Sequence, residues 1–115
     1  MTVKELQERT IRFWEKRNSI YYGYSAKYSG TQPYGMRRNN EYMLLCEIWK
    51  EDVAKIRRGY KDTPWRLAMH FGKHKGRVYC DRTLGDAKYA AETQFISELK
   101  ITEAEYHRLL QQANP

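Results

Sequence analysis

The sequence has few cysteines, few prolines and no long apolar run. Its 115 residues include three prolines and two cysteines, Cys46 and Cys80. Two thiols permit one disulfide at most, and Cys46 lies in an apolar pattern in which a free cysteine acts as a small hydrophobic side chain. The longest clear apolar run is residues 43–46, far shorter than a membrane span, and no apolar signal segment lies near residue 1. We therefore expect a soluble, cytoplasmic protein with no membrane partner.

Catalytic and metal-binding signatures are also missing. The chain contains no G-x-S-x-G motif, no Walker loop, no dinucleotide-binding glycine pattern and no C-x-x-C pair. Four side chains have the chemistry of zinc ligands, but Gly72 interrupts the helix that would align the two histidines: Cys46, His70, His74 and Cys80. No spacing brings together the groups that a nuclease or hydrolase would need, although candidates exist in Glu47, His74 and Asp81. We expect a protein that is not an enzyme and that uses no metal or cofactor.

Positive charge is the strongest feature that is present. The chain has 21 basic and 14 acidic side chains, which gives a net charge of +7. Residues 50–77 alone carry nine basic and three acidic side chains, a net +6, whereas residues 78–115 are net −2. A positive field confined to one part of a chain attracts anionic partners and is typical of nucleic-acid-binding proteins. We expect an anionic partner to bind this segment.

Helical spacing of apolar residues predicts a mainly α fold, a single compact domain of about five helices over residues 1–115. The expected helices cover about 3–20, 41–60, 63–71, 84–99 and 103 onward, with one possible short strand near 77–80. Capping boxes at Thr2 and Glu5 and at Thr102 and Glu105, and a cap at Thr83, support three of the starts. The expected core consists of Phe13, Leu45, Trp49, Val53, Ile56, Phe71, Leu84, Phe95 and Leu109.

An irregular segment of about residues 21–39 follows the first expected helix. Glycine and proline break regular structure there, and five tyrosines accompany Lys27, Arg37 and Arg38. Tyrosine offers a stiff contact surface with a polar tip, which suits base stacking or a protein interface. The alternative is that these rings fold back onto the core.

The favoured function is binding of DNA or RNA through the phosphate backbone, with little sequence specificity. Residues 72–81 are too long for the turn of a helix-turn-helix motif, so the signal is a basic patch and not a motif. The expected contacts are Arg37, Arg38, Lys55, Arg57, Arg58, Arg66, Lys73, Lys75, Arg77, Tyr24, Tyr28 and Tyr34. The alternative is a protein-interaction module, or a phage-type inhibitor, whose basic and Tyr-rich surface blocks an acidic protein surface on a larger, possibly nucleoprotein, assembly.

Overall fold

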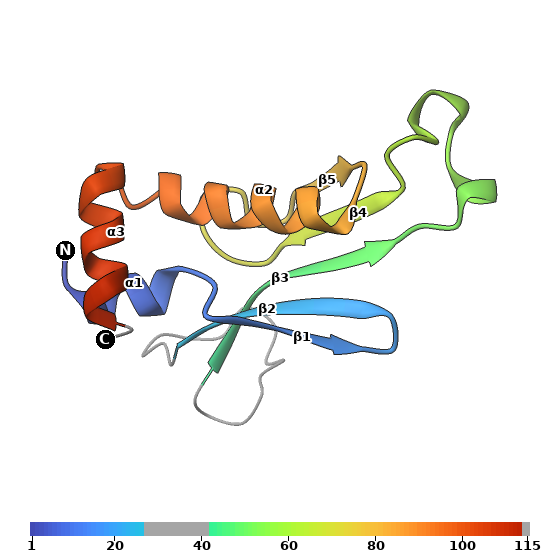
Figure 1. The fold of residues 1–115 in the computed structure, drawn as a ribbon. Helices are drawn as coiled ribbons and strands as arrows, with labels where there is room; N and C mark the ends of the chain where they lie inside the picture. Colours follow the sequence, from blue (N-terminus) through green and yellow to red (C-terminus); the bar gives the residue numbers. More distant parts are fainter. Residues whose placement is uncertain (27–41, 114–115) are drawn as a thin grey trace.

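The computed structural model describes residues 1–26 and 42–113, which form a five-stranded antiparallel sheet and three α-helices (Figure 1). Each strand pairs with the next one in the chain, so the sheet order is β1-β2-β3-β4-β5. The expected mainly α fold with five helices is therefore wrong. The strands are β1 Phe13–Arg17, β2 Ile20–Ala26, β3 Tyr42–Lys50, β4 Trp65–Met69 and β5 Val78–Asp81. The helices are α1 Val3–Arg9, α2 Leu84–Ser97 and α3 Glu103–Ala113, with 3-10 turns η1 Val53–Lys55 and η2 Arg58–Tyr60.

A tight hairpin replaces the second half of the first expected helix. α1 ends at Arg9, and β1 then pairs with β2 in a register that sets Arg17 opposite Ile20. The two residues between them, Asn18 and Ser19, have φ angles of 51° and 68°. Left-handed conformations at both central positions match the twist of a two-residue hairpin turn, and asparagine adopts them readily. The hairpin also moves β2 into the expected irregular segment, which begins as a strand and not as a loop.

The expected central helix over about 41–60 is wrong because its first half is the strand β3. A short run of apolar residues is compatible with either a buried strand or a buried helix, and periodicity alone does not separate them. In β3 a register shift opposite Gly23 and Tyr24 leaves Leu45 as an extra residue. This bulge allows Leu45 and Cys46, which are neighbours in sequence, to join the same buried cluster. β3 is the central strand of the sheet, and four consecutive apolar residues, 43–46, are buried in it.

The expected helix over 63–71 is likewise a strand, β4. Trp65, Leu67 and Met69 alternate with Arg66 and Ala68, which is the period of two that a strand requires. Thr63 and Pro64 resemble a helix start, but they end the connection from β3 instead. The short strand expected near residues 77–80 is confirmed as β5, which pairs with β4.

The two C-terminal helices are confirmed. Thr83 accepts a hydrogen bond from the Asp86 N–H at the start of α2, and Thr102 accepts one from the Glu105 N–H before α3. The capping interaction of Thr2 with the Glu5 N–H at the start of α1 is also confirmed. Each of these caps joins residues three positions apart, so the sequence alone is enough to predict it.

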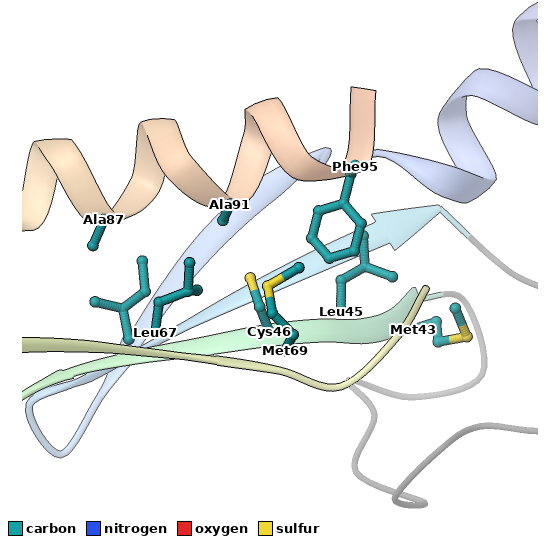
Figure 2. Packing of buried hydrophobic residues seen from close by; sticks show 9 residues of the cluster. Met43, Leu45, Cys46, Leu67, Met69, Ala87, Ala91 and Phe95 are labelled. Carbon is teal, nitrogen blue, oxygen red and sulfur yellow. The ribbon is translucent and has the colours of Figure 1, made fainter. Parts of the chain in front are cut away.

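The main core lies between α2 and one face of the sheet. Ala87, Ala91 and Phe95 follow one stripe of α2 and pack on side chains of β3 and β4, as Figure 2 shows. The small alanines allow the helix to approach the strands closely. The buried cluster comprises Met43, Leu45, Cys46, Ile48, Leu67, Met69, Ala87, Ala91 and Phe95.

The expected core is correct in part. Leu45, Ile56, Phe95 and Leu109 are buried. Phe13 and Trp49 are only half-buried, because β1 and β3 place them on the face of the sheet away from α2. Phe71, after β4, and Leu84, at the start of α2, are also half-buried and pack against the margin of the main core. Val53 is 44% exposed, since it lies in a turn outside the sheet and not on a helical stripe.

The ends of the sheet carry different structures. α1 and α3 lie together at one end, where Leu6, Leu99 and Leu109 form a second buried cluster. Residues 51–64 project from the opposite end (Figure 1). None of the helices in the described ranges has the length and apolar character needed to cross a membrane.

Candidate nucleic-acid interface

Residues 51–64 form a long connection from β3 to β4. This connection, the excursion, extends away from the sheet and is held by its own hydrogen bonds. Its base is closed by the Glu51 N–H, which donates to the Pro64 carbonyl over 2.8 Å. η1 begins at Asp52, whose carboxylate accepts a hydrogen bond from the Ala54 N–H at 3.0 Å. These bonds give the excursion a defined position beside β4 and β5.

Three of the expected basic contacts line one open pocket at this excursion. Ile56 is 7% exposed, while its neighbours Lys55 and Arg57 are exposed. Arg66 reaches the pocket from β4, and its guanidinium also donates a hydrogen bond to the Thr63 carbonyl. The pocket has a volume of about 430 Å³ and is lined by Glu51, Lys55, Ile56, Arg57, Tyr60, Arg66 and Cys80.

The pocket carries excess positive charge. Across residues 1–26 and 42–113, neither Lys55 nor Arg57 forms an ion pair with a carboxylate. Arg66 donates to the backbone carbonyls of Thr63 and Trp65. Among the lining residues that the structure describes, Glu51 alone is acidic. Three cations around one carboxylate favour the entry of an anion.

Two further residues of the excursion contribute to this surface. Arg58, an expected contact, is exposed on η2 next to the pocket but is not part of its lining. Tyr60 was expected on the buried stripe of a helix, yet it lines the pocket and is 56% exposed. A tyrosine that follows two arginines and a glycine offers a stacking surface beside cations, and that local composition could have identified it.

Three other expected contacts lie in a different place. Lys73, Lys75 and Arg77 belong to the loop between β4 and β5, at the opposite end of β4 from the pocket. Gly72 has a φ of 88°, a left-handed conformation that suits glycine, and the Lys73 N–H donates to the Glu98 carboxylate at the end of α2. The basic residues expected to act together over 50–77 therefore lie in two separate clusters.

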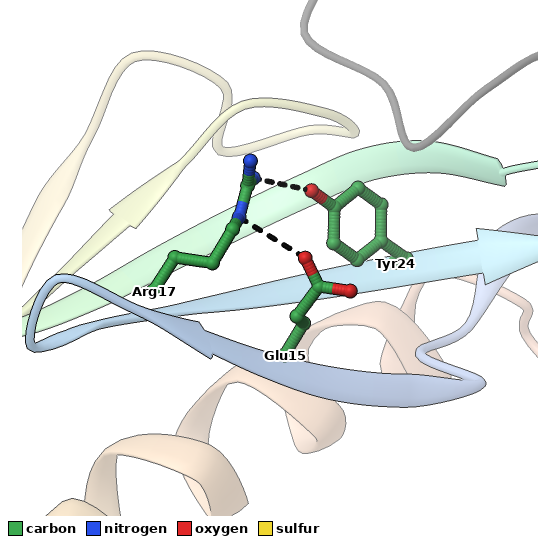
Figure 3. Close-up of polar contacts among 3 residues, drawn as sticks. All are labelled: Glu15, Arg17 and Tyr24. Carbon is green, nitrogen blue, oxygen red and sulfur yellow. Dashed lines mark hydrogen bonds and ion pairs between the residues drawn. The ribbon is translucent and has the colours of Figure 1, made fainter.

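Tyr24 does not belong to an exposed surface, because it is fully buried. Its hydroxyl accepts a hydrogen bond of 2.8 Å from Arg17, which also pairs with Glu15 at 3.0 Å (Figure 3). The Arg17 guanidinium further lies over the Tyr22 ring, 4.3 Å from its centroid. The structure thus places Tyr24 in the interior and not on the exposed surface on which it was expected. The remaining expected contacts lie outside the described residues: Tyr28, Tyr34, Arg37 and Arg38.

The two cysteines among the candidate metal ligands lie on opposite faces of the sheet, whereas Glu47 and His70 come together. Cys46 points toward α2 and is buried, and this burial raises the pKa of its thiol. Cys80 is exposed and pairs in register with Arg66, on the other face. Glu47 pairs with His70 at 3.1 Å. No three His, Cys, Asp or Glu side chains in the described part of the chain form a group suited to a metal ion.

Comparison of the chain with models of protein families, with curated proteins and with solved structures gave no match. We therefore infer a function from the geometry and charge of the pocket.

Proposed function

We propose that the protein binds nucleic acid through the phosphate backbone at the pocket formed by Lys55, Arg57 and Arg66. The observation that carries this proposal is the convergence of three cations without carboxylate partners, in the described residues, on one open pocket. Phosphate contacts need Lys and Arg and carry no sequence information. Binding is therefore weakly sequence-specific and strongly salt-dependent. The expected cytoplasmic location is part of this proposal.

The chemistry of the lining suits a phosphate better than a neutral ligand. Arginine presents a planar set of donors that matches phosphate oxygens, while lysine adds a compact point charge. Tyr60 and Ile56 supply an apolar wall next to these cations. A sugar or base attached to the phosphate has a surface to contact there.

The test is fluorescence anisotropy with a labelled oligonucleotide over a salt series, using charge reversals at matched positions. Lys55→Glu and Lys4→Glu change the net charge equally, but Lys4 is exposed on α1 at the other end of the molecule (Figure 1). Lys55→Glu is expected to weaken binding at least about tenfold at moderate salt, because a lost charge-assisted contact is replaced by repulsion. Lys4→Glu is expected to change affinity by less than about twofold, because salt screens distant charges.

Equal losses in the two variants would show that only net charge matters and would refute a site at the pocket. Absence of binding at low salt would refute the nucleic-acid proposal. A pull-down would then test the alternative of an acidic protein partner.

A further inference from the structure

The sheet has a second face that no α-helix covers within the described residues. Side chains alternate along a strand, so the residues next to the α2-facing Cys46, Ile48 and Leu67 point away from the core. On this opposite face, Trp49 of β3 pairs with Arg66 of β4, which pairs with Cys80 of β5. Val78 and Cys80 of β5 are both exposed, Val78 to 54%, so solvent reaches this face of the sheet at β5.

A neighbouring row on the same face adds a second aromatic ring. Tyr22 of β2 is opposite Glu47 of β3, which is followed across the sheet by Ala68 and Val78. Tyr22 and Trp49 are both half-buried, and neither belongs to the cluster beneath α2. Two aromatic rings thus lie on one face. Tyr22 is opposite Glu15 and Glu47 and lies under the Arg17 guanidinium, so Trp49, next to Arg66, is the ring placed to contact a base.

Two acidic groups lie on this face. Glu15 pairs with Arg17, and Glu47 lies 3.1 Å from His70. Arg66 hydrogen-bonds to carbonyl oxygens and has no carboxylate partner among residues 1–26 and 42–113. The aromatic face is therefore bordered by uncompensated positive charge, which complements a polyanion.

The aromatic face and the basic pocket are continuous. Arg66 and Cys80 line the pocket, and they are also the neighbours of Trp49 in its row. Adjacent strands lie about 4.8 Å apart, so Trp49 is one strand away from the pocket wall. A phosphate held by Lys55 and Arg57 would leave the attached base close to the Trp49 ring.

We propose that the preferred ligand is single-stranded nucleic acid, whose unpaired bases stack on Trp49 while its phosphates occupy the pocket. This inference rests on the proposed function and specifies its substrate class. Bases in a duplex are paired and stacked on each other, whereas unpaired bases are open to aromatic side chains on a sheet.

The helices do not favour a duplex. A helix that enters the major groove lies close to negatively charged phosphates, so its surface should not carry excess negative charge. α2 and α3 instead carry more acidic than basic side chains, with Asp86 and Glu92 against Lys88, and Glu103 and Glu105 against Arg108.

The experiment titrates the protein with three ligands about 15 nucleotides long, near the upper end of single-strand site sizes, and compares them at equal phosphate concentration. These are a single strand, an abasic strand and a duplex, each followed by anisotropy and by tryptophan emission. The single strand is expected to bind at least about fivefold more tightly than the abasic strand, which lacks the bases. It should also quench tryptophan emission.

Two variants assign the effect to Trp49. Trp49→Leu removes the ring and is expected to weaken single-strand binding at least about fivefold while leaving abasic binding unchanged. Trp49→Phe keeps a ring and should bind nearly as well as wild type, but most of the quenching should disappear. Trp14 and Trp65 remain as internal references, since both pack against the cluster beneath α2. The Trp49→Phe result stays informative even if Trp49→Leu folds poorly.

Equal affinity for all three ligands, together with unchanged quenching in Trp49→Phe, would overturn the stacking inference and leave backbone binding intact. Absence of binding to every ligand would instead overturn the proposed function itself.

Discussion

Gly23 offers a test of the sheet that depends on one close approach between strands. Gly23 lies in β2 between Trp14 of β1 and Cys46 of β3. A Cβ at this position would be 2.8 Å from the Cys46 sulfur and 3.0 Å from the Trp14 ring. Because non-bonded heavy atoms prefer separations of about 3.5–4.0 Å, a Gly23→Ala substitution forces Cys46 or Trp14 to move.

Two opposing effects set the magnitude of the Gly23→Ala change. Overpacking a buried site costs about 1–3 kcal/mol. Replacing glycine by alanine restricts the unfolded chain and recovers about 0.4–1 kcal/mol where the backbone conformation is permissible. Cys46 is fully buried and has little room to rotate, so the overpacking effect is expected to exceed the entropic one. We expect a net loss of about 1–2 kcal/mol in the free energy of unfolding.

The assay is urea denaturation of four proteins: wild type, Gly23→Ala, Cys46→Ala and the double variant. Removing the sulfur relieves the closest contact, so the cost of Gly23→Ala should fall by about 1 kcal/mol in the Cys46→Ala background. Unchanged slopes of the unfolding free energy against urea would show that the unfolded state is the same throughout. A neutral Gly23→Ala, or an equal cost in both backgrounds, would refute the pairing of β2 with β3 in this register.

Two other predictions concern Asp81 and Tyr24. Burial is the larger cause, and the nearby charge of Asp86 the smaller cause, of a raised pKa at Asp81. The ionised carboxylate therefore destabilises the fold at neutral pH, and this loss of stability is relieved as the pH falls through the raised pKa. Asp81→Asn should therefore raise Tm at pH 7, with an advantage that shrinks toward acidic pH; a constant difference across pH would contradict this cause. Tyr24→Phe removes the acceptor of the Arg17 hydrogen bond and should cost about 1.5–3 kcal/mol in stability without changing oligonucleotide affinity. Weaker binding at unchanged Tm would instead make Tyr24 a partner contact.

The helix starts could be predicted from sequence because their determinants are local. Thr2, Thr83 and Thr102 each cap a helix within three residues of themselves. Ala87, Ala91 and Phe95 follow the helical period of the helix expected over 84–99, and all three are buried. Such contacts require no knowledge of the rest of the chain.

The sheet could not be predicted in the same way, because pairing partners are distant in sequence. The apolar residues of β3 fit a helical stripe as well as a strand, and only burial by β2, β4 and α2 decides between them. Asn18 and Ser19 form a hairpin turn, but they lack the Asn-Gly sequence from which such a turn is usually predicted. The alternation of Trp65, Leu67 and Met69 was available, but Thr63 and Pro64 resemble a helix start.

The candidate site was predictable in composition but not in arrangement. Charge counting identified Lys55, Arg57 and Arg66 as members of a basic segment, and these residues line one pocket. It could not separate them from Lys75, which the β4–β5 connection places at the other end of the strand. Trp49 was expected in the core, and Tyr60 belonged to the helix expected over about 41–60, but the sheet leaves Trp49 half-buried and the excursion leaves Tyr60 exposed.

Cys80 provides the most direct measurement of binding at the pocket. It is exposed in the pocket lining, whereas Cys46 is buried with a raised pKa, so a maleimide should react at Cys80 in the native protein. A Cys80→Ala variant that does not react would confirm this assignment. At an oligonucleotide concentration about ten times Kd, the labelling rate should fall about tenfold and recover as salt is raised. An unchanged labelling rate, while anisotropy shows the oligonucleotide bound, would contradict binding at the pocket of Lys55, Arg57 and Arg66.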